Sequence, residues 1–241
     1  MRAVILAGGR GTRLAPYTTF LPKPLLPVGE MPILEFLIRR LKAQGIEHVT
    51  LSVGYLSSLL LAFFGDGARF GVTIDYSQEQ EPLGTAGPIA LVPGLTDTFL
   101  AMNGDLLTDL DLRAMVDFHR ERGAVATVGV YGRRSVPIDF GVIELDDAQK
   151  VTGYIEKPVY NFPVSMGVYV FEPSVLNFMS AGQRLDLPDL IRSLIGAGHP
   201  VFAYLHSGYW LDIGRPDDYQ LAQEDFPRLS KLLGDSEKRE L

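Results

Sequence analysis

The order of apolar and polar residues predicts that strands and helices alternate along the first half of the chain. Short apolar runs, typical of buried strands, occur at residues 3–6, 48–53, 72–76, 99–102 and 124–130. Segments with apolar residues at helical spacing lie between them, at residues 32–45, 57–64, about 88–91 and 112–122. This alternation predicts an α/β protein with a mostly parallel sheet and helices on both faces.

The pattern changes after residue 131. Apolar runs at 141–145 and 151–156 flank two aspartates and predict a hairpin, and residues 165–171 alternate as in a further strand. The remaining predicted elements are short helices at 174–178 and 187–194, strands at 201–205 and 209–213, and a final helix opened by Pro216. We interpret residues 1–229 as one domain, with residues 132–229 inserted into and packed on the same sheet, and residues 230–241 as a charged, frayed tail.

Composition narrows the classes of function. The net charge of −7 argues against a nucleic-acid-binding surface, and the absence of cysteine excludes disulfides and thiolate metal sites. The apolar run near the N-terminus is too short for a signal peptide, and no run approaches the ~20 residues of a membrane span. We therefore expect a cytoplasmic globular protein with no membrane partner, and we leave a homo-oligomer open.

The first predicted strand leads into a loop that holds Gly8, Gly9 and Gly11. Glycine lets backbone N–H groups approach a ligand closely, and clustered N–H donors favour anions. No acid occurs before Glu30, whereas the cations of this stretch are Arg2, Arg10, Arg13 and Lys23. The loop is therefore suited to a polyphosphate.

Two common nucleotide loops do not fit this stretch. The dinucleotide fingerprint needs a third glycine that opens a helix, but Leu14 stands at that position and prolines follow it. The P-loop of kinases and ATPases is also absent, because no Gly-Lys-Ser/Thr occurs.

Two acids are candidates for a metal site. Asp105 directly follows the predicted strand at 99–102, and ligands of open α/β sheets bind beyond the carboxyl ends of strands. Asp212 lies in an apolar strand, where an unpaired carboxylate is costly. Two carboxylates that share Mg²⁺ with phosphate oxygens would explain both residues. Asp109 is better explained as a turn residue.

The loop at residues 76–88 is the candidate for recognition of a base. Gly84 and Gly87 would allow a ring to stack on the backbone. A carboxylate accepts both donors of the guanine pairing edge, so Glu79 and Glu81 favour GTP. Gln78 and Gln80 keep a uracil or thymine base open.

Five motifs, spread over about residues 2–226, resemble those of the sugar-phosphate nucleotidyltransferases. They are the Gly8–Leu14 loop, Pro22-Lys-Pro24, Asn103-Gly-Asp105, Glu156-Lys-Pro158 and Trp210-Leu-Asp-Ile-Gly214. The loop Glu81–Pro88 is similar to that of mannose-1-phosphate guanylyltransferases, and the pattern also resembles heptose-1-phosphate guanylyltransferases. The resemblance implies a three-layer α/β/α Rossmann-like nucleotidyltransferase fold. It has a mixed, mostly parallel central sheet, with a nucleotide-binding half at 1–131 and a small sugar-binding β portion within 132–229.

The resemblance implies transfer of a nucleotidyl group from an NTP to a sugar 1-phosphate, with release of pyrophosphate. It assigns catalytic roles to Arg13, Lys23 and Lys157, and Mg²⁺ to Asp105 and Asp212. The implied nucleotide-binding residues are Leu6, Ala7, Gly8, Gly9, Gly11, Thr12, Glu79, Glu81, Gly84, Thr85, Asn103 and Gly104. The implied sugar-binding residues are Gly141, Glu156, Lys157 and Ser165.

One position departs from the family pattern. Ser165 stands where the family usually has an asparagine that grips the sugar, so the sugar's identity stays open among hexoses, heptoses and cyclitols. A thymidylyl- or uridylyltransferase is the alternative within the family. A rival from another functional class is an inactive paralogue that binds sugar nucleotide and regulates an active partner. The joint presence of Arg13, Lys23, Asp105 and Asp212 counts against it.

Overall fold

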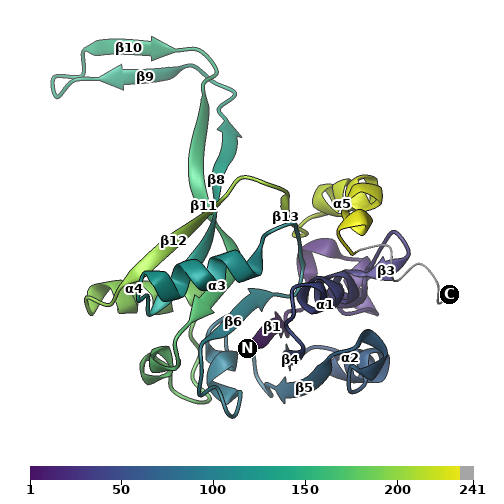
Figure 1. The fold of residues 1–241 in the computed structure, drawn as a ribbon. Coiled ribbons are helices and arrows are strands. Elements are labelled where there is room, and N and C mark those ends of the chain that lie inside the picture. The colour runs from purple at the N-terminus through teal and green to yellow at the C-terminus, as the bar shows by residue number, and fades with distance from the viewer. Residues whose placement is uncertain (234–241) are drawn as a thin grey trace.

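The computed structural model describes residues 1–233, and its centre is a seven-stranded mixed sheet (Figure 1). The strand order is β12-β8-β11-β6-β1-β4-β5. The bounds of these strands are β1 Arg2–Ala7, β4 His48–Val53, β5 Thr73–Gln78, β6 Phe99–Asn103, β8 Ala126–Pro137, β11 Val159–Phe171 and β12 Val201–His206. β1 pairs in parallel with β4 and β6, whereas β11 runs antiparallel to both of its neighbours. The predicted mixed, mostly parallel sheet is confirmed.

Helices cover both faces of this sheet because its buried strands are apolar on both sides. Ile5 of β1 belongs to the core shared with α1 (Ile33–Ala43), α2 (Ser57–Phe64) and α3 (Leu112–Glu121). The next residue towards the N-terminus, Val4, faces the opposite core, which contains the 3₁₀ helix at 87–91 and α4 (Leu187–Gly196). Successive side chains on a strand point to opposite faces. The three-layer arrangement is therefore confirmed.

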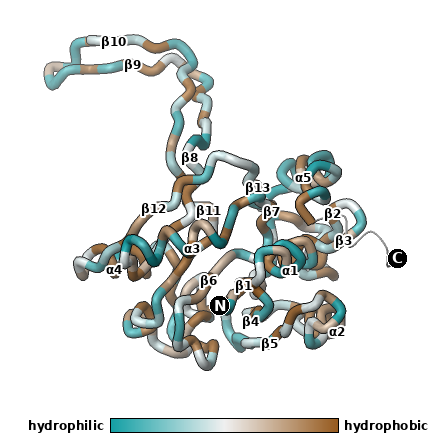
Figure 2. Tube along the Cα trace, in the orientation of Figure 1, coloured by the Kyte–Doolittle hydropathy of each residue, from teal (hydrophilic) through white to brown (hydrophobic). Residues whose placement is uncertain are grey.

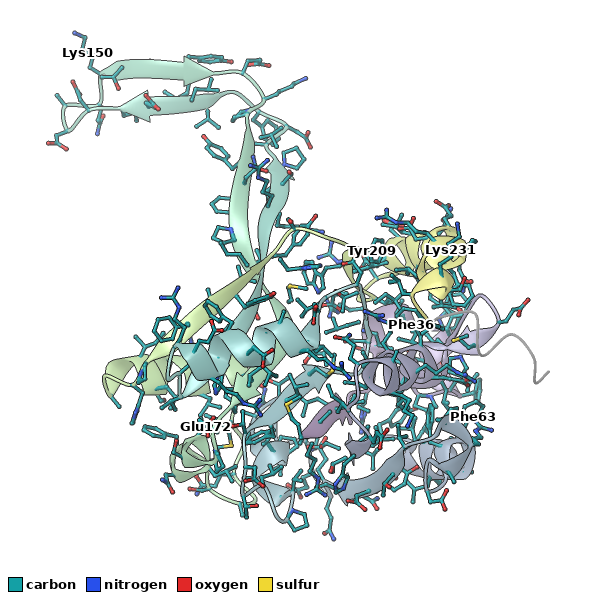
Figure 3. All side chains as sticks on the ribbon, in the orientation of Figure 1. Phe36, Phe63, Lys150, Glu172, Tyr209 and Lys231 are labelled. Carbon is teal, nitrogen blue, oxygen red and sulfur yellow. The ribbon has the colours of Figure 1, made fainter. Side chains whose placement is uncertain are left out.

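A third apolar cluster joins residues 14–36 to residues 211–229. Leu14 and Phe36 pack there with Leu211 and with Phe226 of α5 (Pro216–Leu229). Figure 3 labels Phe36 on α1, which lies beside α5. The short strand pairs β2–β3 (Pro27–Val28 and Met31–Pro32) and β7–β13 (Leu106–Thr108 and Trp210–Asp212) complete this region. The cluster brings the segment after the glycine loop next to residues 211–229.

Most predicted elements occur within a few residues of their expected bounds. The side chain of Asp111 accepts a hydrogen bond from the Ala114 N–H, so it caps α3 as a helix N-cap should. The strand predicted at 209–213 occurs as β13, but β2, β3 and β7 were not predicted, because strands of two or three residues leave little periodicity to detect. Within the described residues, no helix has the length and apolar character needed to cross a bilayer.

The prediction for residues 132–229 is partly wrong. β8, β11 and β12 join the central sheet, but β8 and β11 continue past it as a two-stranded ribbon. The hairpin of β9 (Val142–Leu145) and β10 (Val151–Ile155) sits at the far end of that ribbon, well away from the body (Figure 1). The hairpin does not pack on the sheet, because the ribbon keeps its pairing as far as Val159 opposite Pro137.

Candidate active site

The two predicted metal-binding aspartates are neighbours in space. Asp105 precedes β7, and Asp212 is the last residue of β13. These strands pair antiparallel with Leu106 opposite Asp212, and the Ile213 N–H donates a 3.1 Å hydrogen bond to the Asp105 carbonyl oxygen. The pairing of two very short strands therefore brings together acids from distant parts of the sequence.

The charges around this pair are incompletely balanced. Lys23 Nζ forms an ion pair with Asp105 Oδ2, and the lysine is buried in a 3₁₀ turn at 23–25. Asp105 Oδ1 is also buried, but it has no hydrogen-bond partner among the described residues. Burial and the nearby Asp105 raise the pKa of Asp212, while Lys23 and Arg13 oppose that shift. An orphaned carboxylate oxygen beside a second acid fits a divalent cation.

The protein alone supplies few metal ligands here. In the described part of the chain, no group of three or more histidines, cysteines or acids could hold a metal ion. Mg²⁺ commonly takes one or two carboxylates and completes its shell with water and substrate phosphates. Asp105 and Asp212 therefore suit an ion that arrives with a phosphorylated ligand.

A cavity of about 490 Å³ lies over the glycine loop, at the carboxyl ends of β1 and β6; we call it the glycine-loop cavity. Most of the residues predicted to bind the nucleotide line it. They are Leu6, Ala7, Gly8, Gly9, Gly11, Glu79, Gly84, Thr85, Asn103 and Gly104. The predicted catalytic residues Arg13 and Lys23 and the predicted metal ligand Asp105 line the cavity too. Ligands of open α/β sheets bind at this end of the strands.

Gly8 and Gly11 of the loop are constrained by their surroundings, whereas Gly9 is not. A methyl group on Gly8 would collide with Glu79 Oε1, whereas one on Gly9 would meet nothing within 4 Å. Gly11 has a φ of +62°, and its carbonyl oxygen accepts from the Leu14 N–H and from the Thr18 hydroxyl. The loop is therefore held in one shape by its own hydrogen bonds and by Glu79.

Two predicted nucleotide-binding side chains do not line this cavity. Thr12 lies outside its lining, and Glu81 is exposed on the loop. Glu79 does line it, and its Oε2 accepts a 3.0 Å hydrogen bond from the Leu83 N–H. Of the two glutamates expected at a base, only Glu79 is therefore brought to the cavity.

A second cavity, of about 480 Å³, contains Ser165; we call it the serine cavity. Ser165 Oγ lies 2.9 Å from the Tyr169 hydroxyl, and Asn103 and Asp212 also line the space. Asp186 closes one side and accepts a hydrogen bond from the Thr85 N–H. Tyr169 and Asp186 were not predicted as site residues, because their positions depend on contacts between distant segments.

A third cavity, of about 300 Å³, is lined by Arg13, Arg134 and Arg215, together with Trp210 and Asp212; we call it the arginine cavity. Among the described residues, none of the three guanidinium groups forms an ion pair. Unpaired cations in a concave site favour an anionic ligand. Arg215 directly follows the Trp210–Gly214 motif, but only the fold brings Arg134 beside it.

The remaining predicted sugar-binding residues lie elsewhere. Gly141, Glu156 and Lys157 are on the projecting ribbon and hairpin, and they line none of the three cavities. Glu156 Oε2 accepts a 2.9 Å hydrogen bond from the Tyr154 hydroxyl, which also lies over Gly141. The structure does not bring these three residues to Ser165.

Asp109 has a structural role, as expected for a turn residue. Its Oδ1 accepts a 2.7 Å hydrogen bond from the Tyr209 N–H and pairs with His206 Nε2 at 2.9 Å. These contacts hold the segment that leads into β13, so Asp109 supports the position of Asp212 without joining it.

Comparison with known proteins assigns the chain to a family. The family described as nucleotidyl transferase matches residues 2–228. This chain belongs to the nucleotidyl transferase family. It is 37% identical to a UTP--glucose-1-phosphate uridylyltransferase of Synechocystis, over 91% of this chain and 61% of that protein. It is also 37% identical to a mannose-1-phosphate guanylyltransferase of Mycobacterium tuberculosis, over 94% of this chain and 64% of that protein. The nucleotidyl transferase chain thus spans less than two thirds of these relatives' length.

Solved structures share the fold of this nucleotidyl transferase. A Bacillus anthracis protein described as a glucose-1-phosphate thymidylyltransferase, in complex with a sucrose, superposes with a TM-score of 0.73 at 26% identity. That match covers 93% of this chain and 94% of the other. HddC from Yersinia pseudotuberculosis superposes with a TM-score of 0.71 at 25% identity, covering 93% of this chain and 99% of that one.

Proposed function

We propose that this nucleotidyl transferase moves a nucleotidyl group from an NTP to a sugar 1-phosphate, giving an NDP-sugar and pyrophosphate. The observation that carries the proposal is the convergence of Arg13, Lys23, Asp105 and Asp212 at the edge of the glycine-loop cavity. The names of the relatives support the same reaction class, since they include uridylyl- and guanylyltransferases of sugar 1-phosphates.

The residues of this chain act by binding and by neutralising charge. Backbone N–H groups of the glycine loop bind phosphate oxygens of the NTP, and Arg13 stabilises the pyrophosphate as it leaves. Lys23 is placed beside Asp105, so it can also reach a phosphate oxygen bound there. Asp105 and Asp212 would hold Mg²⁺, which supplies positive charge to the phosphates when bound. Positioning the sugar phosphate opposite the leaving pyrophosphate then contributes to the rate enhancement.

The two further cavities fit the second substrate. The serine cavity offers hydroxyls and carboxylates, the groups that bind sugar hydroxyls, and Asp212 connects it with the phosphates. The arginine cavity reaches Asp212 from its other side and supplies Arg134 and Arg215 as counter-charges. A triphosphate and a sugar phosphate together carry more negative charge than Arg13 and Lys23 alone can balance.

GTP is the preferred nucleotide, because the carboxylate of Glu79 lines the cavity where a base would lie. A uridylyl- or thymidylyltransferase is the second candidate, favoured by the uridylyltransferase among the relatives. Pyrophosphate release, measured with each NTP and a panel of hexose and heptose 1-phosphates, tests the choice. Faster release with UTP or dTTP than with GTP would contradict the role given to Glu79.

The same assay separates the enzyme from an inactive sugar-nucleotide sensor. The sensor would bind a sugar nucleotide, detected by calorimetry, yet release no pyrophosphate with Mg²⁺ and any substrate pair. An enzyme releases pyrophosphate, and EDTA abolishes that release. Asp117→Asn, at a largely exposed side chain on α3 outside the three cavities, is the control and should leave binding unchanged.

A further inference from the structure

Residues 132–163, which we call the arm, expose an unusual amount of apolar surface. Ten of the nineteen large apolar side chains that are exposed in residues 1–233 lie on the arm. Phe140 is 77% exposed, Tyr154 63% and Phe162 50%. Figure 2 shows apolar residues along the ribbon and the hairpin, and Figure 3 shows side chains there, including Lys150, with no neighbouring element. Contiguous apolar surface of this kind marks an interaction site.

The arm has no packing partner within the described chain. β9 and β10 pair only with each other, and two-stranded hairpins are marginally stable alone. The ribbon is held away from the body by backbone pairing that includes Tyr160 opposite Val136, and the Ser135 hydroxyl donates to Asn161 Oδ1 at 2.7 Å. This pairing extends the arm away from the body, so its apolar side chains are available to another molecule.

The same chain carries a second exposed apolar surface, directly after the glycine loop. Phe20 is 83% exposed, Tyr17 55% and Leu21 41%. This segment is tied to the loop by the hydrogen bond from the Thr18 hydroxyl to the Gly11 carbonyl oxygen. We call Tyr17, Phe20 and Leu21 the rim. An arm and a rim on one chain are the two halves that a self-complementary contact needs.

We propose that the arm of one copy packs on the rim of a second copy and brings Glu156 and Lys157 to the second copy's arginine cavity. The exchange is reciprocal about a two-fold axis, so it closes at a dimer and covers both apolar surfaces. It also accounts for the position of Glu156 and Lys157 outside their own chain's cavities. The contribution of Lys157 to catalysis rests on the proposed function, whereas the contact between arm and rim does not.

The first experiment measures the contact without any substrate. The chain has no cysteine, so Phe20→Cys and Phe140→Cys can be made on separate chains and mixed. A short bismaleimide can then join only two different copies. The arm-to-rim contact predicts a cross-linked dimer, whereas Ile195→Cys, at a site 59% exposed on α4, gives none with Phe140→Cys.

Light scattering on the full chain adds an independent reading. The unaltered protein is expected to be a dimer. Tyr154→Ser with Phe162→Ser is expected to be monomeric and still folded by circular dichroism, since both side chains are largely exposed in a single chain. A monomeric unaltered protein, or a dimer that yields no cross-link between Phe20→Cys and Phe140→Cys chains, would overturn the proposal.

The second experiment asks which copy's arm serves which cavity. Lys157→Gln disables an arm, and Asp105→Asn disables a cavity. Refolding the two variants together at equal ratio produces mixed dimers in which one cavity with Asp105 receives an arm with Lys157. At this ratio about half of the dimers are mixed, and each mixed dimer has one intact site out of two. Exchange between copies therefore predicts recovery to about a quarter of the unaltered turnover.

An arm that served its own chain would give no recovery, because each chain then lacks one of the two residues. That result, in a protein shown to be dimeric, would overturn the exchange. Absence of turnover in the unaltered protein with every NTP and sugar 1-phosphate would instead contradict the proposed function. The cross-linking and light-scattering results would still decide the contact between arm and rim.

Discussion

The body and the arm hold their candidate site residues in two different ways. Lys23 is buried, ion-paired with Asp105 and enclosed by a turn, whereas Lys157 lies on the arm, between β10 and β11. In the body, the packing that stabilises the fold also fixes the chemistry. In the arm, folding and function are separable, because a side chain there can change without disturbing the core.

The largest expected effect is on the body's acid pair. Asp105→Asn removes a charge that both Lys23 and a divalent ion would use, so turnover should fall at least ~10²–10³-fold, as for other charge-stabilising groups. Pyrophosphate release measures it. Asp117→Asn, at a side chain 68% exposed on α3, is the control and should leave turnover unchanged. Near-normal turnover in Asp105→Asn would remove the acid pair from the mechanism.

The two lysines provide the direct comparison of body and arm. Lys23→Gln and Lys157→Gln should each reduce turnover, by ~10²-fold if each contacts a phosphate in the transition state. Lys23→Gln should also lower the free energy of unfolding by about 1–3 kcal/mol, since it leaves Asp105 without its partner. Urea titration separates the two variants. Equal stability losses in both would show that the arm is part of the folded core.

A smaller effect is expected at the glycine loop. Gly8→Ala places a methyl group against Glu79 Oε1, so the Glu79 side chain must move and loses its hydrogen bond from the Leu83 N–H, at a cost of about 0.5–1.5 kcal/mol in stability. The KM for the NTP should rise with it. Gly9→Ala is the matched control, because nothing lies within 4 Å of its new methyl group. Loss of NTP binding in the control alone would mean that the backbone at Gly9, rather than Gly8, sets the loop.

The smallest expected effect is a pH dependence confined to the body. Burial lowers the pKa of His119, against the opposing charge of Glu172, and no histidine lies on the arm. His119 therefore binds a proton more readily in the unfolded chain than in the folded body. As a result, the free energy of unfolding falls as the pH drops through the ordinary histidine pKa near 6.5. His119→Gln should make the thermal midpoint less dependent on pH between about 7.5 and 5.5. An unchanged slope would assign the dependence to another group.

Much of the body followed from the sequence. The apolar runs at 48–53 and 99–102 were long enough to predict β4 and β6, and the rule that ligands bind beyond strand ends placed Asp105. The approach of Asp212 to Asp105 was also predicted, from the cost of an unpaired carboxylate and from the motif, but not from strand pairing, because β7 was not predicted. Local pattern carries information about an element, not about its neighbours.

The rest depended on contacts between distant segments. Arg134 and Arg215 are ordinary charged residues in sequence, and only the fold brings them to one cavity with Arg13. Glu79 resembled a base-binding residue, and the structure adds that it also holds the Leu83 N–H. The projection of the arm was not predictable, because alternation at residues 141–156 is the same whether a hairpin lies on a sheet or extends from it.

The pairing of β7 with β13 has a further consequence. It joins only three residues on each side, yet each of the three cavities has Asp105 or Asp212 in its wall. Sliding one strand by a single residue would exchange Asp212 for Leu211 and turn an acid wall into an apolar one. The alignment of these six residues thus decides which side chain lies where the three cavities meet.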